Sequence, residues 1–527
     1  MREKEWKEKE REKRPIAYLE KGQGGKTRLM VDGTPFFVLG GEVHNSTASS
    51  EAYMDKYVWR HLPDKYLNTL LVPICWDLVE KKQGKFDFEI PRRIIDNARK
   101  NKVHLIFLWF GLWKNGASHY APSWLLKENR RYFRARVKGG IPSATVSPFC
   151  KDAVEADAGA FSKFMAFLRE YDQEERTVIM IQVENEVGFL GGNRDYSLEA
   201  RAQYNKEIPP KLKYFFKREG IWKQVFGERA DDYFMAWYFA EAVERIAAAG
   251  KREYPLPMYV NAWLEGFPFR PGEYPTGGPT ARMIQMWKLA APSIDMISPD
   301  IYDPDFFSCC EPYAKANGLF IPETGRQPVA ASNVLGMLGA YDAIGYSLFG
   351  IEDLWNAQYY DAMCLEEKDA LRIDWKWDVC EDGTNRYINA AYQIIDSVWE
   401  LYLEKQDICQ GFAKRNIYDR GAVLRYGKYD VILKYSQGEG EKAGSAGILL
   451  PDEEDQFYLI GCNATVRVCA AVGEESTAEL LEVWEGIFQN NIFLEGRKLN
   501  GDELYAQCRL GDIPSVIKVK VGMLETD

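Results

Sequence analysis

The chain has 527 residues, of which 46% are hydrophobic and 28% are charged, so it can bury a large core and is not an intrinsically disordered protein. Its formal net charge of −11 argues against nucleic acid or an anionic membrane as the main partner. No apolar run approaches the length of about 18 residues that a membrane-spanning helix needs, so we expect a soluble, globular protein.

The N-terminal segment alternates basic and acidic side chains over residues 1–14, and residues 1–29 are predicted to form a charged tail. This segment lacks the apolar stretch of a secretory signal. The 10 cysteines show no CxxC pair, and the 4 histidines show no metal-binding spacing. We therefore expect free thiols, no metal ion, no cofactor and a cytoplasmic location.

The next part of the chain repeats a short apolar run followed by a longer amphipathic stretch. Continuous apolar runs of this length are typical of strands that are buried on both faces of a parallel sheet. The runs lie at residues 36–40, 69–72, 104–110, 178–183, 258–261, 296–298, 318–322 and 345–349, and the clearest helical patterns between them lie at residues 153–171, 231–249 and 333–344. This alternation predicts a (β/α)8 TIM barrel over residues 30–408 within the α/β class, ending in a helix at about residues 384–405.

The pattern changes in residues 409–527. Short apolar runs separated by Gly-rich and Asp-rich turns are typical of antiparallel strands, and residues 516–521 end in a strict alternation of apolar and basic side chains. These residues are predicted to form an appended β-sandwich domain. We expect this domain to have a structural role rather than a polysaccharide-binding one.

Two glutamates lie where the active site of a TIM barrel is found, at the C-terminal ends of strands. Glu186 follows the fourth apolar run, and Glu323 follows the seventh. Cleavage of a glycosidic bond requires two carboxyl groups, one that protonates the leaving oxygen and one that attacks the anomeric carbon or activates water. Other polar or aromatic side chains at strand ends are expected around the same cavity: Glu42, His44, Trp76, Asn261, Asp300 and Tyr302.

Several tryptophans also lie at or just beyond the predicted strand ends. A flat indole ring can stack on the apolar face of a sugar, although core packing explains any one of them equally well. Trp113 and Trp263 follow polar loops and are the strongest candidates for sugar contact.

Three segments carry a resemblance to a known family. Gly41-Glu-Val-His44, Trp76-Asp-Leu-Val-Glu80 and Gly84-Lys-Phe-Asp-Phe88 resemble the first part of the glycoside hydrolase family 35 β-galactosidases. The block Gln182-Val-Glu-Asn-Glu-Val-Gly188 resembles the fourth-strand signature of that family. Residues 108–116 and the chain beyond about residue 410 look like a bacterial subgroup with its own β-rich C-terminal domain.

The resemblance implies roles for individual residues. Glu186 would be the general acid/base, Glu323 the nucleophile, and Asn185 a hydrogen-bond partner of the sugar 2-hydroxyl. The implied activity is that of a retaining exo-β-galactosidase, which hydrolyses terminal β-D-galactosyl residues from oligosaccharides by double displacement. In such enzymes the two carboxyl groups lie about 5–5.5 Å apart.

Two points qualify the comparison. Glu184 lies two residues before Glu186, on the same side of a regular strand, and is expected to have a structural role, with an arginine as a candidate partner. Many family members have Cys, Ala and Glu after the third strand, where this chain has Trp113, Lys114 and Asn115. We assign Lys114 and Asn115 to sugar binding, and this departure leaves the identity of the sugar open.

Alternative functions remain at this point. The chain could be a retaining glycosidase for a β-glucoside, β-fucoside or α-arabinoside, or a non-catalytic sugar-binding protein on a glycosidase fold. The presence of both candidate carboxylates argues against the non-catalytic alternative. An oligosaccharide is the expected partner, nucleic acid and membranes are not, and homo-oligomer formation is left open.

Overall fold

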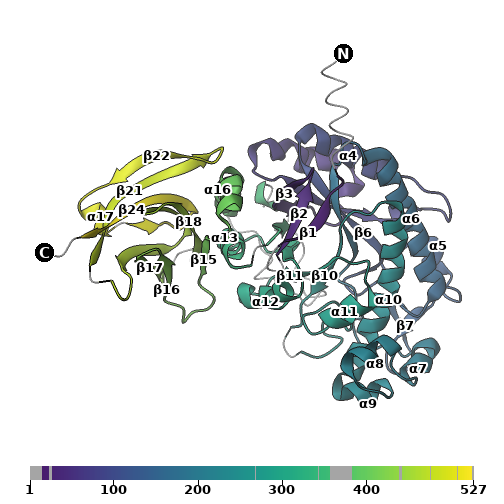
Figure 1. Ribbon diagram of the computed structural model, residues 1–527. Helices are drawn as coiled ribbons and strands as arrows, with labels where there is room; N and C mark the ends of the chain where they lie inside the picture. The colour runs from purple at the N-terminus through teal and green to yellow at the C-terminus, as the bar shows by residue number, and fades with distance from the viewer. Residues whose placement is uncertain are drawn as a thin grey trace.

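The computed structural model describes residues 15–22, 26–266, 269–341, 343–355, 383–437, 442–474, 476–506 and 508–524. The charged segment expected over residues 1–14 lies outside the described residues. The chain forms a barrel and an antiparallel sandwich, with α13 (Val329–Tyr341) and α16 (Thr384–Lys405) between them (Figure 1).

The barrel sheet contains only parallel pairs, and its strand order is β12-β14-β4-β5-β6-β9-β10-β11-β13. The strands that match the first six apolar runs are buried almost throughout, as expected for a sheet covered by helices. They are β4 (Val38–Glu42), β5 (Thr69–Cys75), β6 (His104–Lys114), β9 (Val178–Asn185), β10 (Met258–Trp263) and β11 (Met296–Ile301).

The seventh strand closes the barrel in two pieces that flank Pro322. Its first piece, β12 (Phe320–Ile321), pairs with β14 (Gly345–Phe349), and its second piece, β13 (Glu323–Thr324), pairs with β11. Proline has no N–H to donate to a neighbouring strand, so a break at this residue is expected. The predicted eight-stranded barrel is confirmed.

Helices cover the outside of the barrel. The long helices α6 (Lys151–Asp172) and α10 (Ala230–Glu253) extend the predicted ranges by a few residues, whereas α13 begins and ends earlier than predicted. The remaining helices before α13 are α2 (Glu51–Tyr57), α3 (Trp76–Val79), α4 (Glu89–Asn101), α5 (Ser123–Lys127), α7 (Leu198–Tyr204), α8 (Pro210–Phe216), α9 (Trp222–Phe226), α11 (Ile284–Ala290) and α12 (Phe306–Ala316). A two-stranded ribbon, β7 (Arg134–Arg136) and β8 (Pro142–Val146), follows α5.

A small antiparallel sheet precedes the barrel and was not expected. It contains β1 (Tyr18–Lys21), β2 (Thr27–Val31) and β3 (Thr34–Phe36), so the boundary expected after residue 29 falls inside β2. The turn between β2 and β3 is Asp32-Gly33, and both residues have positive φ, 51° and 82°. Asp-Gly between apolar segments is a strong hairpin signal, which the charge of the preceding residues obscured.

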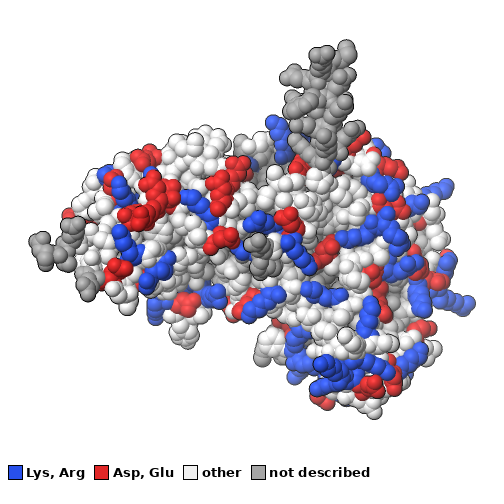
Figure 2. All heavy atoms as spheres, viewed as in Figure 1, with Lys and Arg blue, Asp and Glu red and all other residues white. Residues whose placement is uncertain are grey.

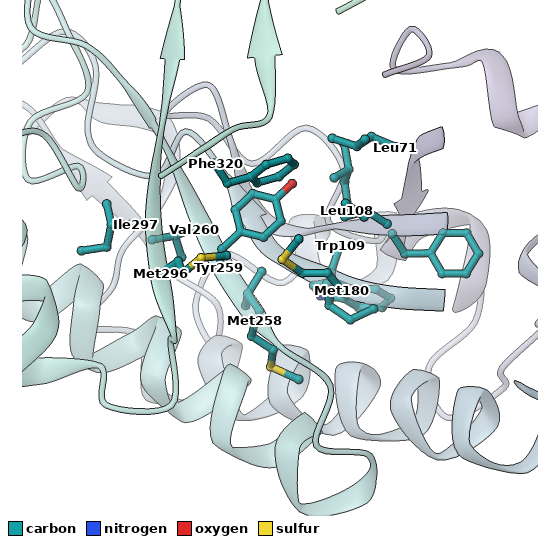
Figure 3. Packing of buried hydrophobic residues seen from close by; sticks show 14 of the residues in the cluster. Leu71, Leu108, Trp109, Met180, Met258, Tyr259, Val260, Met296, Ile297 and Phe320 are labelled. Carbon is teal, nitrogen blue, oxygen red and sulfur yellow. The ribbon is translucent and has the colours of Figure 1, made fainter. Parts of the chain in front are cut away.

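The inside of the barrel is packed with large apolar side chains. Figure 3 shows Met180, Tyr259 and Phe320, from three different strands, directed toward one another. The rings of Tyr259 and Phe320 meet edge to face with centroids 5.3 Å apart. This core fills the barrel below the strand ends that carry the polar residues.

The C-terminal domain contains two antiparallel sheets, as predicted. One has the order β15-β18-β19-β24-β21-β22 and the other β16-β17-β20-β23, and a separate apolar core lies between them. The strands are β15 (Gln410–Ala413), β16 (Gly421–Tyr426), β17 (Tyr429–Tyr435), β18 (Ala446–Glu453), β19 (Gln456–Cys462), β20 (Ala464–Ala470), β21 (Thr477–Gln489), β22 (Ile492–Leu499), β23 (Arg509–Leu510) and β24 (Ser515–Leu524), with α17 (Asp502–Ala506) before β23.

The outer face of the six-stranded sheet packs on the barrel. Ile448, Ile460 and Val516 of this sheet belong to the same buried apolar cluster as the barrel core. The backbone N–H of Gly444 donates to Oγ of Ser332 in α13 at 2.9 Å. The sandwich therefore covers α13 and α16, and the structural role expected for it stays a prediction.

The surface carries both signs of charge over both domains on the face shown in Figure 2. A single continuous basic band, such as nucleic acid would need, is not a feature of this face. None of the helices in the described part of the chain has the length and apolar character of a membrane-spanning segment.

Candidate active site

The structure brings the two predicted catalytic glutamates together at the C-terminal end of the barrel strands. Glu186 directly follows β9, Glu323 begins β13, and their side chains are only 7% and 8% exposed. One carboxylate oxygen of each lies within 4.8 Å of the other and of an oxygen of Asp300 in β11. Among the described residues this is the only group of three such side chains close enough to surround a cation; the sequence predicts no metal.

The environment of Glu186 favours its protonated form. Burial, followed by the negative charge of Glu323, raises the pKa of Glu186 to about 8, against the lowering effects of the charge of Lys114 and of a side-chain hydrogen bond with Asp300. Its backbone N–H donates to Oδ1 of Asn261 at 2.8 Å. A carboxyl group that keeps its proton near neutral pH is suited to act as a general acid.

The environment of Glu323 contains a hydrogen-bond donor. The hydroxyl of Tyr302, directly after β11, donates to Oε1 of Glu323 at 2.6 Å. A hydrogen bond to a carboxylate favours the ionised form, which is the form that a nucleophile needs. The predicted position of Tyr302 at the cavity agrees with this contact, although its contact with a sugar stays a prediction.

Lys114 links the other polar residues expected around the cavity. Its Nζ lies 3.1 Å from Oδ1 of Asn185 and 2.6 Å from Oδ1 of Asn115. Its charge lowers the pKa of Glu42, which burial and the neighbouring Glu323 raise well above the usual value. Lys114 thus offsets part of the negative charge of the cavity.

Two buried polar atoms of this group have no hydrogen-bond partner within the part of the chain that the structure describes. They are Oε1 of Glu42 and Nδ2 of Asn185. A buried polar atom without a partner costs about 1–3 kcal/mol, so such atoms point to a ligand with hydroxyl groups. Substrate contact by Glu42 and Asn185 remains a prediction that this geometry supports.

Glu184 lies away from the cavity. Its carboxylate accepts hydrogen bonds from the backbone N–H groups of Leu112 and Trp113, at 3.2 and 2.6 Å. Its partner is the carboxyl group of Asp157 in α6 and not the arginine that was considered, and both side chains are 0% exposed. Burial, followed by the charge of Asp157, raises the pKa of Glu184 well above its usual value, which favours a proton on this pair of carboxyl groups.

The expectation that Glu184 and Glu186 share one side of the strand is wrong. Both residues have positive φ, 63° and 44°, which interrupts the alternation of a regular strand. This irregularity separates the structural carboxyl group from the catalytic one.

His44 belongs to a charged network next to the cavity. Its Nε2 lies 3.1 Å from Oδ2 of Asp353, and Nε of Arg326 lies 3.1 Å from the same oxygen. The backbone N–H of His44 donates to Oε1 of Glu352 at 3.1 Å. The sequence argument did not include Arg326 and Asp353, although Asp353 follows the eighth strand, where functional side chains are expected.

The structure argues against sugar contact by two of the predicted tryptophans and leaves the third as a candidate. Trp76 and Trp113 are fully buried, and their Nε1 atoms donate to Oε2 of Glu80 at 2.7 Å and to the carbonyl of Val146 at 2.9 Å. Neither ring can stack on a sugar without rearrangement, because neither has any exposed surface. Trp263, at the end of β10, is partly exposed and stays a candidate for sugar contact.

Comparison with protein families gives two matches. Residues 28–232 match the model described as "Glycosyl hydrolases family 35", and residues 388–509 match a model described as "Domain of unknown function (DUF5597)". The first match contains Glu186 and ends before Glu323.

Two curated relatives show the same similarity. The chain is 26% identical over 187 residues to a β-galactosidase of Xanthomonas manihotis, which covers 34% of this chain and 28% of that protein. It is 26% identical over 183 residues to β-galactosidase-1-like protein 3 of Rattus norvegicus, covering 33% of this chain and 26% of that protein. The matched segment thus spans little more than a quarter of either relative.

Solved structures with a similar fold include two carbohydrate-active enzymes. The catalytic domain of β-amylase from Paenibacillus polymyxa matches with a TM-score of 0.45 and 13% identity, over 60% of this chain and 92% of that one. A β-galactosidase from Rahnella sp. R3 matches with a TM-score of 0.43 and 13% identity, over 59% and 50%. These scores are too low to relate the chain to either enzyme. The relationship to glycosyl hydrolases family 35 that the sequence predicts is confirmed by the family match over residues 28–232.

Proposed function

We propose that the chain is a retaining exo-β-galactosidase that hydrolyses terminal β-D-galactosyl residues of oligosaccharides. The observation that carries the proposal is the pair Glu186 and Glu323, whose oxygens approach within 4.8 Å in a nearly buried cavity. Retaining enzymes hold their carboxyl groups about 5–5.5 Å apart, whereas inverting enzymes separate them by about 6.5–9.5 Å to make room for a water molecule. The short separation favours a direct attack by one carboxylate.

The residues have distinct roles in the proposed reaction. A carboxylate oxygen of Glu323 attacks the anomeric carbon, and Glu186 gives its proton to the leaving oxygen as the glycosidic bond breaks. Glu186, now ionised, then takes a proton from water, which attacks the anomeric carbon and releases Glu323. Tyr302 holds Glu323 through its hydrogen bond, and Asn261 fixes the backbone of Glu186.

The identity of the sugar rests on weaker support. The matched relatives are named as β-galactosidases, and the unpartnered atoms of Glu42 and Asn185 suit sugar hydroxyls. A retaining glycosidase that acts on a β-glucoside, β-fucoside or α-arabinoside would use the same two carboxyl groups.

The test is hydrolysis of a panel of aryl glycosides by the wild type and by the Glu186→Gln and Glu323→Gln variants. We expect release from the β-galactoside, a loss of at least about 10⁴-fold in kcat for Glu323→Gln, and a loss of about 10²–10⁴-fold for Glu186→Gln. Glu199→Gln, on the exposed face of α7, is the matched control and should keep full activity.

Two further outcomes separate the parts of the proposal. Azide should restore turnover in Glu186→Ala, because a small anion can attack the glycosyl intermediate without a general base. Turnover of another glycoside alone would keep the mechanism and change the substrate. Activity that survives in Glu323→Gln would overturn the assignment of the nucleophile.

A further inference from the structure

Asp300 is a third carboxyl group in the cavity, and the proposed reaction assigns it no role. It lies at the end of β11, is 3% exposed, and places an oxygen within 4.8 Å of both Glu186 and Glu323. A carboxyl group in this position must either add a negative charge to the cavity or carry a proton. The hydrogen bonds around it decide between these two states.

The orientation of the Asn261 side chain follows from a backbone group. The N–H of Glu186 can only donate, so the atom of Asn261 that it contacts at 2.8 Å must be the amide oxygen. The amide nitrogen of Asn261 therefore faces Asp300 and donates to Oδ2 at 2.6 Å. Since Oδ2 accepts this hydrogen bond, a proton on Asp300 resides on Oδ1.

Oδ1 of Asp300 is buried and accepts no hydrogen bond from a donor among the residues that the structure describes. The side chain of Asp300 also forms a hydrogen bond with the carboxyl group of Glu186, and a contact between two carboxyl groups requires a proton on one of them. An ionised oxygen in this position would lie unsatisfied beside other carboxylates, which costs far more than a neutral hydroxyl that donates to one of them.

The charged surroundings act in the same direction. The titratable groups that face Asp300 or its neighbours are Glu42 on β4, Lys114 on β6, Glu186 after β9, Tyr259 on β10, Tyr313 on α12 and Glu323 on β13. Burial raises the pKa of Asp300 well above its usual value, and the charges of Glu323, Glu186 and Glu42 raise it further. Lys114 is the positively charged residue of this set, and its charge lowers the pKa values of Glu42 and Glu186.

We propose that Asp300 is a positioning residue whose protonated Oδ1 donates a hydrogen bond to the catalytic carboxyl pair and so keeps the negative charge on Glu323. This inference rests on the proposed function, because it takes Glu323 as the nucleophile. Tyr302 donates to Glu323, and a proton on Asp300 gives the catalytic pair a second neutral donor. A neutral acid can stabilise the ionised nucleophile without adding charge to the cavity.

The first test compares the pH dependence of kcat/KM in Asp300→Asn, Asp300→Ala and the wild type, with Asp303→Asn as the exposed control on the same loop. The acidic limb of the profile is the fall of kcat/KM at low pH, where Glu323 takes up a proton. The asparagine variant keeps a neutral donor, so the midpoint of its acidic limb should stay within about 0.3 pH units of the wild-type midpoint. The alanine variant loses the donor, so its acidic limb should move up by about one to two pH units. If Asp300 had a purely structural role, Asp300→Ala would lower the maximum value of kcat/KM and leave the midpoint of the acidic limb unchanged.

The direction in which the acidic limb shifts also shows whether Asp300 is ionised instead of protonated. If Asp300 were ionised, Asp300→Asn would remove a negative charge beside Glu323, and the acidic limb would move to lower pH. That result, or an unmoved limb in both variants, would overturn the proposal.

The second test does not need turnover. Infrared difference spectra of the wild type and Asp300→Asn at neutral pH show whether the lost signal is that of a carboxylic acid or of a carboxylate. Loss of a carboxylic acid band supports the proposal, and loss of a carboxylate band contradicts it. The two proposals can fail separately. If the wild type shows the carboxylic acid band of Asp300 but hydrolyses no glycoside, the proposed function is disproved and the proton on Asp300 is still established.

Discussion

At the scale of single residues, Glu186 and Glu323 are the same amino acid in two different environments. Burial and a neighbouring charge favour the proton on Glu186, while Tyr302 donates a hydrogen bond to Glu323. Environments that favour the proton on one carboxyl group and the charge on the other suit the first to the role of acid and the second to that of nucleophile. The sequence could identify both residues from their positions at strand ends, but their surroundings depend on β10 and β11, far away in the sequence.

The raised pKa of Glu186 has a direct consequence for pH dependence. A general acid works only while it carries its proton, so kcat/KM should keep its plateau value up to about pH 8, above the acidic limb in which Glu323 takes up a proton, and fall as the pH rises through that value. The measurement is a pH profile with an aryl galactoside whose leaving group is poor and needs protonation. The Glu186→Gln variant should lack this basic limb. A limb that remains in the variant would mean that another group controls it.

The cluster of Glu186, Asp300 and Glu323 also makes a prediction about metals. Because protonated Glu186 and the positive charge of Lys114 offset the negative charge, we expect activity to be unchanged after dialysis against EDTA. The measurement is kcat/KM before and after chelation. Loss of activity that a divalent cation restores would show that the carboxylates bind a metal instead of a proton.

At the scale of elements, the end of β9 is the feature that the sequence could not predict. The pattern Glu184-Asn185-Glu186 in a regular strand would direct both glutamates to one side. Left-handed φ values at Glu184 and Glu186 change this, and the hydrogen bonds from Leu112 and Trp113 to Glu184 hold the arrangement. These contacts involve residues about 70 positions earlier in the chain, so no local pattern reveals them.

This arrangement makes Glu184 important for stability. Glu184→Ala would leave the N–H groups of Leu112 and Trp113 without their acceptor and should lower the free energy of unfolding by about 2–5 kcal/mol. Glu184→Gln keeps an acceptor for Trp113 and a donor for Asp157, so we expect less than half of that loss. Urea denaturation of both variants gives the two values. Equal losses would show that the charge, and not the hydrogen bonding, is what matters.

At the scale of the whole molecule, the sandwich and the barrel meet with their backbones in close contact. A Cβ atom on Gly339 of α13 would lie 2.6 Å from the Cα of Gly411 in β15 and from Cγ2 of Ile448 in β18. The sequence predicted both domains from their periodicity, and the order of elements was enough for this. It did not predict their contact, which depends on small residues that show no pattern.

This close approach can be tested by a single methyl group. Gly339→Ala should lower the free energy of unfolding by about 1–3 kcal/mol, because the backbone of β15 must move to make room. Gly159→Ala is the matched control, since Gly159 is an exposed residue of α6 with nothing within 4 Å of the added atom. The control should gain about 0.5–1 kcal/mol from its better helix propensity. A Gly339→Ala variant as stable as the wild type would show that the domains are not tightly packed there.

The central claim is that Glu323 forms a covalent bond to the sugar. The most direct measurement is mass spectrometry of the protein after incubation with a 2-deoxy-2-fluoro-β-galactosyl fluoride, whose intermediate breaks down slowly. We predict a mass increase of one fluorogalactosyl group on the peptide that contains Glu323, and no increase in Glu323→Gln. Labelling of a different carboxylate, or turnover of aryl galactosides with inverted configuration and no labelling, would contradict the account.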